Sequence, residues 1–479
     1  MVYDILIIGA GVIGGMIARE LSRYELSVCL LEKENDVACG ASKANSGIIH
    51  GGFDPEPGTL KAKLNTLGVP LLYKAARELH VPYVQNGSLV CAFGMEEEPQ
   101  IDMLFQRGLE NGIDGMSVIS GDQARELEPN LSPAITKALL IPSAGIISPY
   151  DLAVAAVGNA MDNGVELQRN FAVASIGTEG DSYAVTDTDG RTLRGRYLIN
   201  CAGGYSDAIA KMVGDSHFTI IPRAGEYMLL DKTEGSRVTR TIFQVPSKEG
   251  KGILVSPTAH GNLLVGPTAT AVATPDSKQT TSEGLAQVRK LSSKSVPSVD
   301  FRQVITSFTG VRASEKSGDF IIEWSENNQN VLHVAAIDSP GLTCCVSIAQ
   351  YVVNMLKDQK LPLIPKADWN GEREDTHAFS HMNEAQKHAF IQKNPAYGKI
   401  VCRCEQISEG EILDAIRRNP GARDMDSIKR RTRSGMGRCQ GGFCGPQVMA
   451  LISKELGIGM EEVTKNGGNS YMVAERIGL

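Results

Sequence analysis

Residues 4–32 read DILIIGAGVIGGMIARELSRYELSVCLLE, and this stretch decides the fold. Residues 5–8 form a short apolar run that leads directly into a glycine-rich turn, after which apolar residues recur at helical spacing. A second apolar run, residues 28–31, ends at the acidic residue Glu32. The pattern therefore predicts a strand, a tight turn, a helix and a second strand, which is the arrangement that binds dinucleotides.

Three glycines give this turn its chemistry. Gly9 permits the tight turn, Gly11 lets the backbone approach a pyrophosphate, and Gly14 lets the helix pack closely on the strand. The helix N-terminus offers N–H groups and a positive dipole end to the phosphates. Glu32 closes the second strand, where a carboxylate accepts a hydrogen bond from an adenosine ribose. A glycine-rich turn alone could be purely structural, but the whole unit with its terminal acid predicts dinucleotide binding.

Length and composition set the class of protein. The chain has 479 residues, 42% of them hydrophobic, so it can bury a large core in about three domains. Its net charge of −7 argues against a nucleic-acid partner, which would need a basic face. No apolar stretch reaches the roughly 20 residues of a membrane-spanning helix, and the N-terminus has no signal-peptide pattern. We therefore expect a cytoplasmic protein without a transmembrane segment, although a partner could bring it into peripheral contact with a membrane.

Three further segments are suited to enclose a bound cofactor. Residues 40–52 form a small, polar, glycine-bearing loop that is too long for a plain connection. A strand over residues 197–200 leads to a glycine pair at Gly203, and residues 338–343 lead into an amphipathic helix over residues 344–356. The positive end of that helix would suit a flavin, which gains negative charge on reduction. The alternatives are a flexible connector for the loop and a structural junction for the glycine pair.

Four of the ten cysteines lie close together near the C-terminus. They form a C-x-C pair, Cys402 and Cys404, and a C-x4-C pair, Cys439 and Cys444. Zinc usually takes C-x2-C pairs, so the unequal spacings and the glycine-rich second loop favour an iron–sulfur cluster. Zinc stays an alternative, whereas disulfides are disfavoured in a cytoplasmic chain. Four arginines near the second pair indicate either a solvated basic face or charges that offset the cluster or guide a partner: Arg430, Arg431, Arg433 and Arg438.

These motifs resemble known families over nearly the whole chain. The N-terminal half, with ANSGIIH at residues 44–50, resembles the glycine-oxidase and D-amino-acid-oxidase type of FAD-dependent oxidoreductase. RTRSGMGRCQGGFC at residues 431–444 resembles the bacterioferritin-associated-ferredoxin-like [2Fe-2S] module. The two together are similar to the large-subunit family of anaerobic glycerol-3-phosphate dehydrogenases. The resemblance implies a substrate-facing arginine, Arg312, and an FAD held by Gly9, Gly11, Gly14, Glu32, Ser42, Asn45, Ser46, Gly203, Gly341, Leu342 and Thr343.

The expected fold class is α/β. A Rossmann-like FAD-binding domain is interleaved with an α+β substrate domain that contains an antiparallel sheet, and a small helical iron–sulfur domain follows. We expect the FAD-binding domain to comprise residues 1–75, 145–215 and 310–362. The substrate domain is expected over residues 76–144 and 216–309. A linker over residues 363–394 and the [2Fe-2S] domain over residues 395–479 complete the chain.

Local departures from the family keep the substrate open. Phe53-Asp54 follows His-Gly-Gly where glycerol-3-phosphate enzymes often have a basic residue, and residues 57–62 look more like L-2-hydroxyglutarate dehydrogenases. Ala313 follows Arg312 where the family usually has proline. The whole-chain combination favours oxidation of sn-glycerol 3-phosphate to dihydroxyacetone phosphate. The alternatives are L-2-hydroxyglutarate or another 2-hydroxy acid, an amino or imino acid, and an electron-transfer subunit without its own organic substrate.

The expected chemistry is oxidation of a small anionic secondary alcohol. Arg312 would pair with the phosphate or carboxylate as a planar, always charged fork. His50 is the first choice for the base that takes the hydroxyl proton, and His260 is the second. The alternative for both histidines is an ordinary loop hydrogen bond. Reduced FAD would then pass electrons through the cluster to a partner, which we expect to be an electron-accepting protein subunit.

Overall fold

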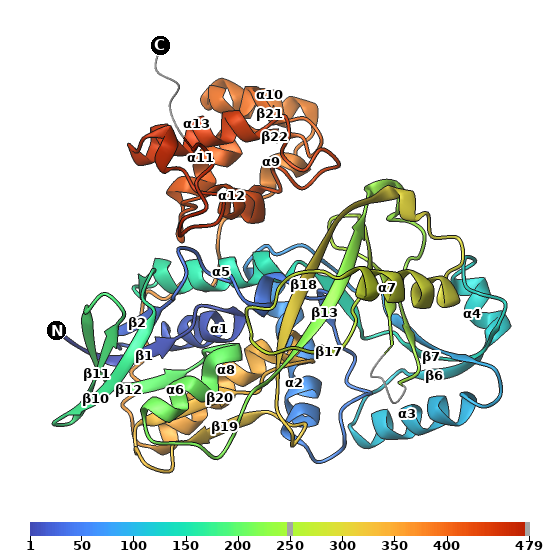
Figure 1. Ribbon diagram of the computed structural model, residues 1–479, viewed down its shortest axis with the longest axis horizontal. Coiled ribbons are helices and arrows are strands. Elements are labelled where there is room, and N and C mark those ends of the chain that lie inside the picture. The colour runs from blue at the N-terminus through green and yellow to red at the C-terminus, as the bar shows by residue number, and fades with distance from the viewer. Residues whose placement is uncertain (247–251, 475–479) are drawn as a thin grey trace.

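The structure is a computed structural model that describes residues 1–246 and 252–474. Figure 1 shows a large body, named here for residues 1–362, and a smaller part that lies against one side of it and begins before residue 395, with α9 (Ala378–His381) and α10 (Glu384–Lys393). The name module is used below for residues 395–474 of that part. The body contains two large sheets, and helices cover the sheet that carries the dinucleotide motif. The predicted fold class is confirmed, because parallel and antiparallel sheets and a helical C-terminal region are all present.

The first sheet has eight strands, and the apolar run of the dinucleotide motif lies at its centre. β1 pairs in parallel with β2 on one side and with β12 on the other. The order is β10-β11-β12-β1-β2-β9, with β20 added to β12 and β19 added to β20. These strands are β1 Val2–Ile8, β2 Val28–Leu31, β9 Glu166–Gln168, β10 Val173–Glu179, β11 Ser182–Asp187, β12 Thr192–Asn200, β19 Ile321–Trp324 and β20 Val331–Ala335.

Helices bury this sheet and position the cofactor turns. α1 packs against α5 and α8, and α8 packs against α2, so one continuous core joins all four helices to the sheet. α8 begins at Gly341, earlier than the predicted residue 344, because tertiary packing outweighs the poor helix propensity of glycine. The helices of this part are α1 Val12–Leu21, α2 Leu60–Glu78, α5 Pro149–Asp162, α6 Ser206–Met212 and α8 Gly341–Asp358.

The second sheet has nine strands in the order β17-β13-β16-β15-β14-β5-β7-β6, with β18 paired to β13. It is antiparallel, as predicted, except for the parallel pair β14 and β5. Its helices are α3 Glu98–Glu110, α4 Gly121–Leu127 and α7 Ser282–Ser295. Its strands are β5 Ser88–Phe93, β6 Ser117–Ser120, β7 Ile135–Ile141, β13 Ile221–Leu230, β14 Thr241–Gln244, β15 Leu254–Pro257, β16 Leu263–Gly266, β17 Thr270–Ala271 and β18 Val304–Ser314.

A small three-stranded sheet lies where the loop of residues 40–52 meets the rest of the body. β3 (Ile48–Ile49) pairs with β8 (Gly145–Ile147), which also pairs with β4 (Tyr83–Val84). The predicted loop therefore contains a short strand, and it also contains a 3₁₀ turn over Ala41–Lys43. Because β3 is paired on one side and fully buried, the residue that follows it, His50, is held in a fixed place.

The arm of residues 363–394 is more structured than a plain linker. Its first part packs on the body, where the Trp369 ring lies 3.8 Å from the Arg23 guanidinium carbon and Pro365 forms a β-bridge with Tyr24. Its second part contains α9 (Ala378–His381) and α10 (Glu384–Lys393). The module then follows with β21 Ile400–Cys402, β22 Ile407–Ser408, α11 Glu409–Arg417, α12 Met425–Thr432 and α13 Gly445–Leu456.

The arginines of the module serve a purpose that the sequence did not indicate. Asp36 is fully buried in the loop after β2, and its carboxylate accepts hydrogen bonds from Arg430 at 2.6 Å and from Arg431 at 2.7 and 2.8 Å. Arg433 donates to Glu405 and to the Tyr150 hydroxyl. A solvated basic face is therefore wrong for Arg430, Arg431 and Arg433, because their side chains are buried where the module meets the body, whereas the Arg438 side chain is exposed.

A substitution of Asp36 tests this docking. Asp36→Asn removes the charge that neutralises two buried guanidinium groups, so we expect the module to dock more weakly by about 1.5 to 3 kcal/mol. The rate of limited proteolysis within the arm should then be at least about tenfold higher than in the unaltered protein. Asp102→Asn, which changes a half-exposed surface pair with Lys137, is the matched control. Equal cleavage rates for both variants would contradict a docking role for Asp36.

Candidate functional site

A cavity of about 1090 Å³ lies where the two large sheets of the body meet. Its walls include the glycine turn after β1, the loop of residues 40–47, the start of α8, and β13 and β18 of the second sheet. Small-molecule pockets usually measure about 300–1,000 Å³, so this cavity has room for a large cofactor and a small substrate together.

The glycine turn is shaped by contacts that no side chain would allow. Gly9 has φ +108°, and a Cβ there would lie 2.4 Å from the Cys201 carbonyl oxygen. A Cβ on Gly14 would lie 1.9 Å from the Gly9 oxygen, so Gly14 serves close packing behind the turn. Gly11 lines the cavity, and a Cβ there would lie 3.0 Å from the Ser42 hydroxyl. The turn is therefore free of side chains on the side where a pyrophosphate would approach.

Ser42 and Glu32 complete this end of the cavity, and both line it. The Ser42 hydroxyl accepts a hydrogen bond from the Val12 backbone N–H at 2.8 Å, which fixes the hydroxyl at the start of α1. The Glu32 carboxylate accepts from the N–H groups of Ala10 and Glu34 at 2.9 and 3.0 Å. Burial raises the pKa of Glu32 to about 7. A ribose hydroxyl donating to this carboxylate would favour its ionised form.

The remaining predicted residues of the loop also line the cavity, but their side chains are used differently from what was expected. The Asn45 side-chain amide donates to the carbonyls of Ala41 and Ser42, and its oxygen accepts from the Gly47 N–H. Ser46 forms a hydrogen bond of 3.2 Å with the Tyr227 hydroxyl of β13. The two side chains shape the loop and tie it to the second sheet, while their backbones border the cavity.

Two other glycine-bearing segments meet this cavity, and one prediction there fails. Gly203, with φ +58°, lines the cavity, as do Gly341 and Leu342 at the N-terminus of α8. Thr343 is fully buried and is not among the described residues that line the cavity. Its hydroxyl instead accepts a hydrogen bond from the His50 backbone N–H at 2.8 Å. The Thr343 side chain therefore holds the backbone of His50 in place and does not border the cavity.

Two arginines give one wall of the cavity a positive charge. Arg312 on β18 donates from both Nη atoms to the Thr268 carbonyl, each at 3.3 Å. Arg223 on β13 lies directly opposite Arg312 in the antiparallel ladder, so the two side chains share one face of the sheet. Both line the cavity. Arg223 could not be found from the sequence alone, because only the strand register reveals that it neighbours Arg312.

His50 lies in the cavity wall beside aromatic rings. Its imidazole stacks on Phe53, with ring centroids 5.4 Å apart, and lies 5.7 Å from the Phe243 ring. The Asn65 side-chain amide donates to the His50 carbonyl at 2.9 Å. The backbone of His50 is therefore held by Thr343 and Asn65 together, which fixes where the imidazole can reach.

The structure contradicts a catalytic role for His260. Its Nε2 lies 3.2 Å from an Asp151 carboxylate oxygen, and its ring stacks on Tyr150 at 6.1 Å between centroids. Tyr150 in turn accepts a hydrogen bond from Arg433 of the module. His260 is not among the described residues that line the cavity, because it belongs to the contact between body and module. The second choice for the base was therefore wrong.

The four predicted cysteines come together in the module. Their sulfurs gather in two pairs, each with one member from each sequence motif: Cys404 with Cys439, 3.6 Å apart, and Cys402 with Cys444. In the described part of the chain, no three His, Cys, Asp or Glu side chains converge closely enough to hold a single metal ion. Two spaced pairs of thiols suit a cluster with two irons better than one zinc ion.

The loop around Cys439 supplies the backbone donors that a cluster needs. Burial tends to raise the pKa of the Cys439 thiol, but the N–H groups of Gly441, Phe443 and Gly442 and the neighbouring Cys404 outweigh it and lower the pKa. Gly441 has φ +89°, which few side chains tolerate. The glycines are therefore required both for the path of the loop and for access of its N–H groups to sulfur.

None of the helices in residues 1–246 and 252–474 combines the length and the apolar character needed to cross a membrane. This agrees with the absence of a long apolar stretch in the sequence.

Two family models cover most of the chain. The family described as FAD dependent oxidoreductase matches residues 4–355, which is more than half of the chain. The BFD-like [2Fe-2S] binding domain matches residues 400–454. The first match contains the cavity, and the second contains all four clustered cysteines. The cofactors predicted from the sequence, FAD and a [2Fe-2S] cluster, are the cofactors of these two families.

Individual proteins agree with the family matches. The glycerol 3-phosphate dehydrogenase of Caloramator mitchellensis is 44% identical over 471 residues, which cover 98% of each chain. The glycerol 3-phosphate oxidase of Mycoplasma genitalium is 32% identical over 375 residues, covering 77% of this chain and 97% of its own.

Solved structures show the same fold. The L-alpha-glycerophosphate oxidase from Mycoplasma pneumoniae, reduced with dithionite and with FAD bound, superposes with a TM-score of 0.75. It is 33% identical and covers 78% of this chain and 98% of its own. These relatives and the cavity geometry agree on one assignment. The chain belongs to the family of FAD-dependent oxidoreductases, and it carries a BFD-like [2Fe-2S] binding domain over residues 400–454.

Proposed function

We propose that this protein oxidises sn-glycerol 3-phosphate to dihydroxyacetone phosphate and delivers the electrons to a partner protein. The observation that carries the proposal is the pair of guanidinium groups, Arg312 and Arg223, on one wall of a cavity whose other end has the dinucleotide turn. A phosphate group binds best between planar donors that stay charged at every working pH. The relatives named for glycerol 3-phosphate support the choice of this anion.

The proposed cofactor residues divide by the part of FAD that each would face. Gly9, Gly11 and Ser42 would border the pyrophosphate, and Glu32 would accept a hydrogen bond from the adenosine ribose. Gly203, Gly341 and Leu342 would lie along the flavin, where the positive end of α8 would favour the negative charge of the reduced ring. When bound, FAD supplies the chemistry of hydride acceptance. We also propose that the eight-stranded sheet forms the FAD-binding domain and the nine-stranded sheet the substrate domain, with the predicted boundaries except at β18, Val304–Ser314, which spans the predicted boundary at residues 309–310 and belongs to the nine-stranded sheet.

The proposed base is His50. The Phe53 and Phe243 rings pack beside it and exclude water from one side of the imidazole, and a neutral imidazole can accept a proton. Thr343 and Asn65 hold its backbone, so the imidazole keeps one orientation towards the cavity. With the phosphate fixed by Arg312, the secondary hydroxyl of the substrate would be presented to this ring.

The electrons would leave the protein through the module. Cys402, Cys404, Cys439 and Cys444 would hold the [2Fe-2S] cluster, which when bound would supply one-electron transfer towards an electron-accepting protein. We propose that the reaction takes place in the cytoplasm. The six cysteines outside the module form no disulfide, among them the fully buried neighbours Cys344 and Cys345, and this suits a reducing compartment.

Product analysis tests the proposal. The enzyme, loaded with both cofactors, should convert glycerol 3-phosphate to dihydroxyacetone phosphate with one equivalent of a two-electron dye reduced per product formed. The controls are glycerol, which lacks the anion, and L-proline and glycine, which are C–N substrates. Dye reduction by the amino acids without any by glycerol 3-phosphate would contradict the proposal.

The role of the guanidinium pair makes a separate prediction. Arg312→Lys keeps a positive charge but loses the planar fork, so kcat/KM for glycerol 3-phosphate should fall about 10- to 100-fold, or about 1.4 to 2.8 kcal/mol. In Arg223→Lys, kcat/KM for glycerol 3-phosphate should also fall. Arg302→Lys, whose side chain is 88% exposed and paired with Asp300, is the control and should stay within about twofold. An unchanged kcat/KM in Arg312→Lys would show that the guanidinium group of Arg312 does not bind the phosphate group of the substrate.

A further inference from the structure

The loop that carries Cys439 and Cys444 exposes a large aromatic side chain to solvent. Phe443, between the ligand positions Cys439 and Cys444, is 85% exposed. A single exposed aromatic ring is ordinary on a protein surface, and what distinguishes this one is its place on the loop that carries two of the cluster ligand positions. The Phe443 N–H nevertheless faces the Cys439 sulfur, so the ring is attached directly to the wall of the cluster site.

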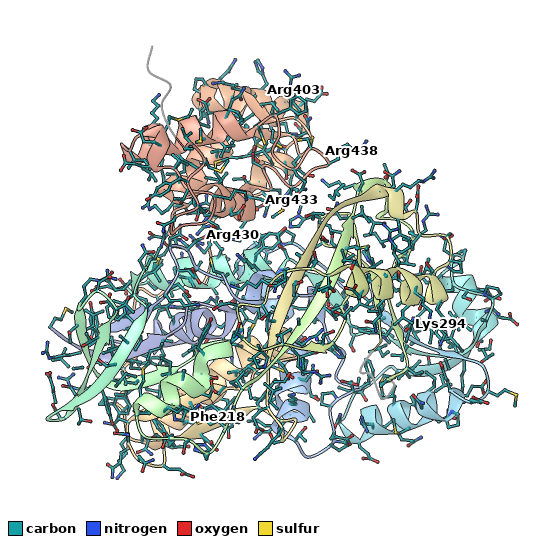
Figure 2. The ribbon with its side chains drawn as sticks, viewed as in Figure 1. Phe218, Lys294, Arg403, Arg430, Arg433 and Arg438 are labelled. Atoms are coloured by element: carbon teal, nitrogen blue, oxygen red, sulfur yellow. The ribbon has the colours of Figure 1, made fainter. Side chains whose placement is uncertain are left out.

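The same surface exposes sulfur and positive charge. Cys404 is exposed, and its sulfur lies 3.6 Å from that of Cys439. Arg403, next to Cys404, is exposed, and the Arg438 side chain is 65% exposed. Figure 2 shows these two arginines on one edge of the module, whereas Arg430 and Arg433 face the body. Phe443, Cys404, Arg403 and Arg438 are called the exit patch below.

Nearby negative charge is already neutralised. The Glu405 side chain is only 5% exposed and is paired with both Arg433 and Lys232. Asp231, 13% exposed, is the partner of Arg438. The exposed part of the exit patch therefore presents an apolar ring and the guanidinium group of Arg403, for which the described residues provide no ion pair, beside the cluster ligands, while the charge of Arg438 is partly offset by Asp231.

We propose that the exit patch is the docking surface for an electron-accepting protein whose own docking face carries carboxylates around its redox centre. This inference rests on the proposed function and adds the surface and the chemistry of the partner. Complementary charge speeds the encounter of two proteins, and a small apolar contact at the centre excludes water where the electron crosses. Such a small surface fits a transient complex, in which the partner leaves after each transfer.

The electron balance sets how often the partner must bind. Oxidation of one alcohol to a ketone releases two electrons and two protons. Each one-electron partner molecule goes from its oxidised to its reduced form once, so two partner molecules are reduced per substrate. The two protons pass to solvent. Release must therefore be fast, which favours a patch held by charge and one ring over a large apolar interface.

Two haem proteins serve as probes of the patch: soluble cytochrome b5, which is acidic, and cytochrome c, which is basic. The holoenzyme is supplied with glycerol 3-phosphate without oxygen, and haem reduction is followed by absorbance. At low ionic strength, Arg403→Glu should slow reduction of cytochrome b5 about tenfold, and this difference should shrink to less than about twofold at high salt. Cytochrome c should be reduced faster by the same variant.

Matched variants separate the patch from general effects. Lys454→Glu makes the same charge reversal at an exposed position of α13, outside the exit patch, and should change the cytochrome b5 rate by less than about twofold. Phe443→Ser should slow the same reaction about three- to tenfold at all salt concentrations, because it removes the apolar contact. In all variants the rate of flavin bleaching by substrate should stay unchanged, because the patch lies outside the cavity.

The outcomes are distinguishable. Equal slowing by Arg403→Glu and Lys454→Glu, or no slowing by either, would overturn the exit patch. Sedimentation of the unaltered protein, but not of Phe443→Ser, with phosphatidylglycerol vesicles, together with unchanged cytochrome rates, would overturn it in favour of a lipid surface. Absence of flavin bleaching in the unaltered protein would instead contradict the proposed function, since that step does not involve the patch.

Discussion

Replacing Gly11 with valine should give a folded protein that no longer retains FAD. A side chain at this position would lie 3.0 Å from the Ser42 hydroxyl already at its Cβ, and its methyl groups would project into the space of the pyrophosphate. Displacing Ser42 would also break its hydrogen bond with the Val12 N–H at the start of α1. We expect FAD affinity to fall at least about 100-fold, or about 2.8 kcal/mol.

The measurement is the flavin absorbance that stays with the protein after gel filtration. Gly177→Ala in β10 of the same sheet is the control, because a Cβ there would meet nothing within 4 Å. Far-ultraviolet circular dichroism of both variants checks that each is folded. Full flavin content in Gly11→Val would show that the cofactor does not lie across this turn.

Replacing Cys439 with serine should remove the second cofactor without stopping the first half of the reaction. Cys439 is the ligand position that receives three backbone N–H groups from the 441–443 loop, and serine is a much weaker ligand for iron. Iron and acid-labile sulfide should fall to background in the anaerobically purified variant. A single turnover with substrate should still bleach the flavin at about the normal rate, while reduction of an external protein acceptor should be lost.

Cys39→Ser, a half-buried cysteine outside the module, is the control and should keep the full iron content. Two results would contradict the account. The first is zinc with no labile sulfide in the unaltered protein, which would exclude the electron path. The second is full reduction of a protein acceptor by Cys439→Ser, which would show that electrons leave directly from the body.

The parts of this protein that are local in sequence could be predicted from the sequence. The turn from Gly9 to Gly14 and the acid Glu32 are fixed by steric and hydrogen-bonding rules within one βαβ unit, so the pattern determines the geometry. The ligand positions Cys402, Cys404, Cys439 and Cys444 were likewise visible, because their side chains have few other uses in such spacing. These features needed no knowledge of the tertiary arrangement.

The parts that depend on distant contacts could not be predicted. Arg223 neighbours Arg312 only through the pairing of β13 with β18. The register of two strands that lie far apart in the chain cannot be predicted from the sequence of either strand. Thr343 lies in a glycine-bearing helix start, yet its side chain faces the core instead of the cavity. His260 has the same local polarity as a catalytic histidine, but Asp151 and Tyr150 fix it in the contact with the module.

The arginines of the module show the same limit most clearly. Their clustering near the cysteines indicated an effect on the cluster, because only sequence distance was available. The structure pairs Arg430 and Arg431 with Asp36, which follows the first βαβ unit at the opposite end of the chain. A run of charged residues predicts that some of them form ion pairs, but which acidic residue each one contacts depends on how the domains pack.

Anaerobic reduction of the bound flavin by single substrates is the most direct test of the central claim. Glycerol 3-phosphate and L-2-hydroxyglutarate are offered separately to the oxidised holoenzyme without oxygen or any added acceptor, and the flavin absorbance is followed. The account predicts rapid bleaching by glycerol 3-phosphate, strongly slowed by Arg312→Lys, and none of comparable rate by L-2-hydroxyglutarate. Bleaching by L-2-hydroxyglutarate alone would contradict the proposed substrate, and bleaching by neither compound but by an amino acid would contradict the reaction class.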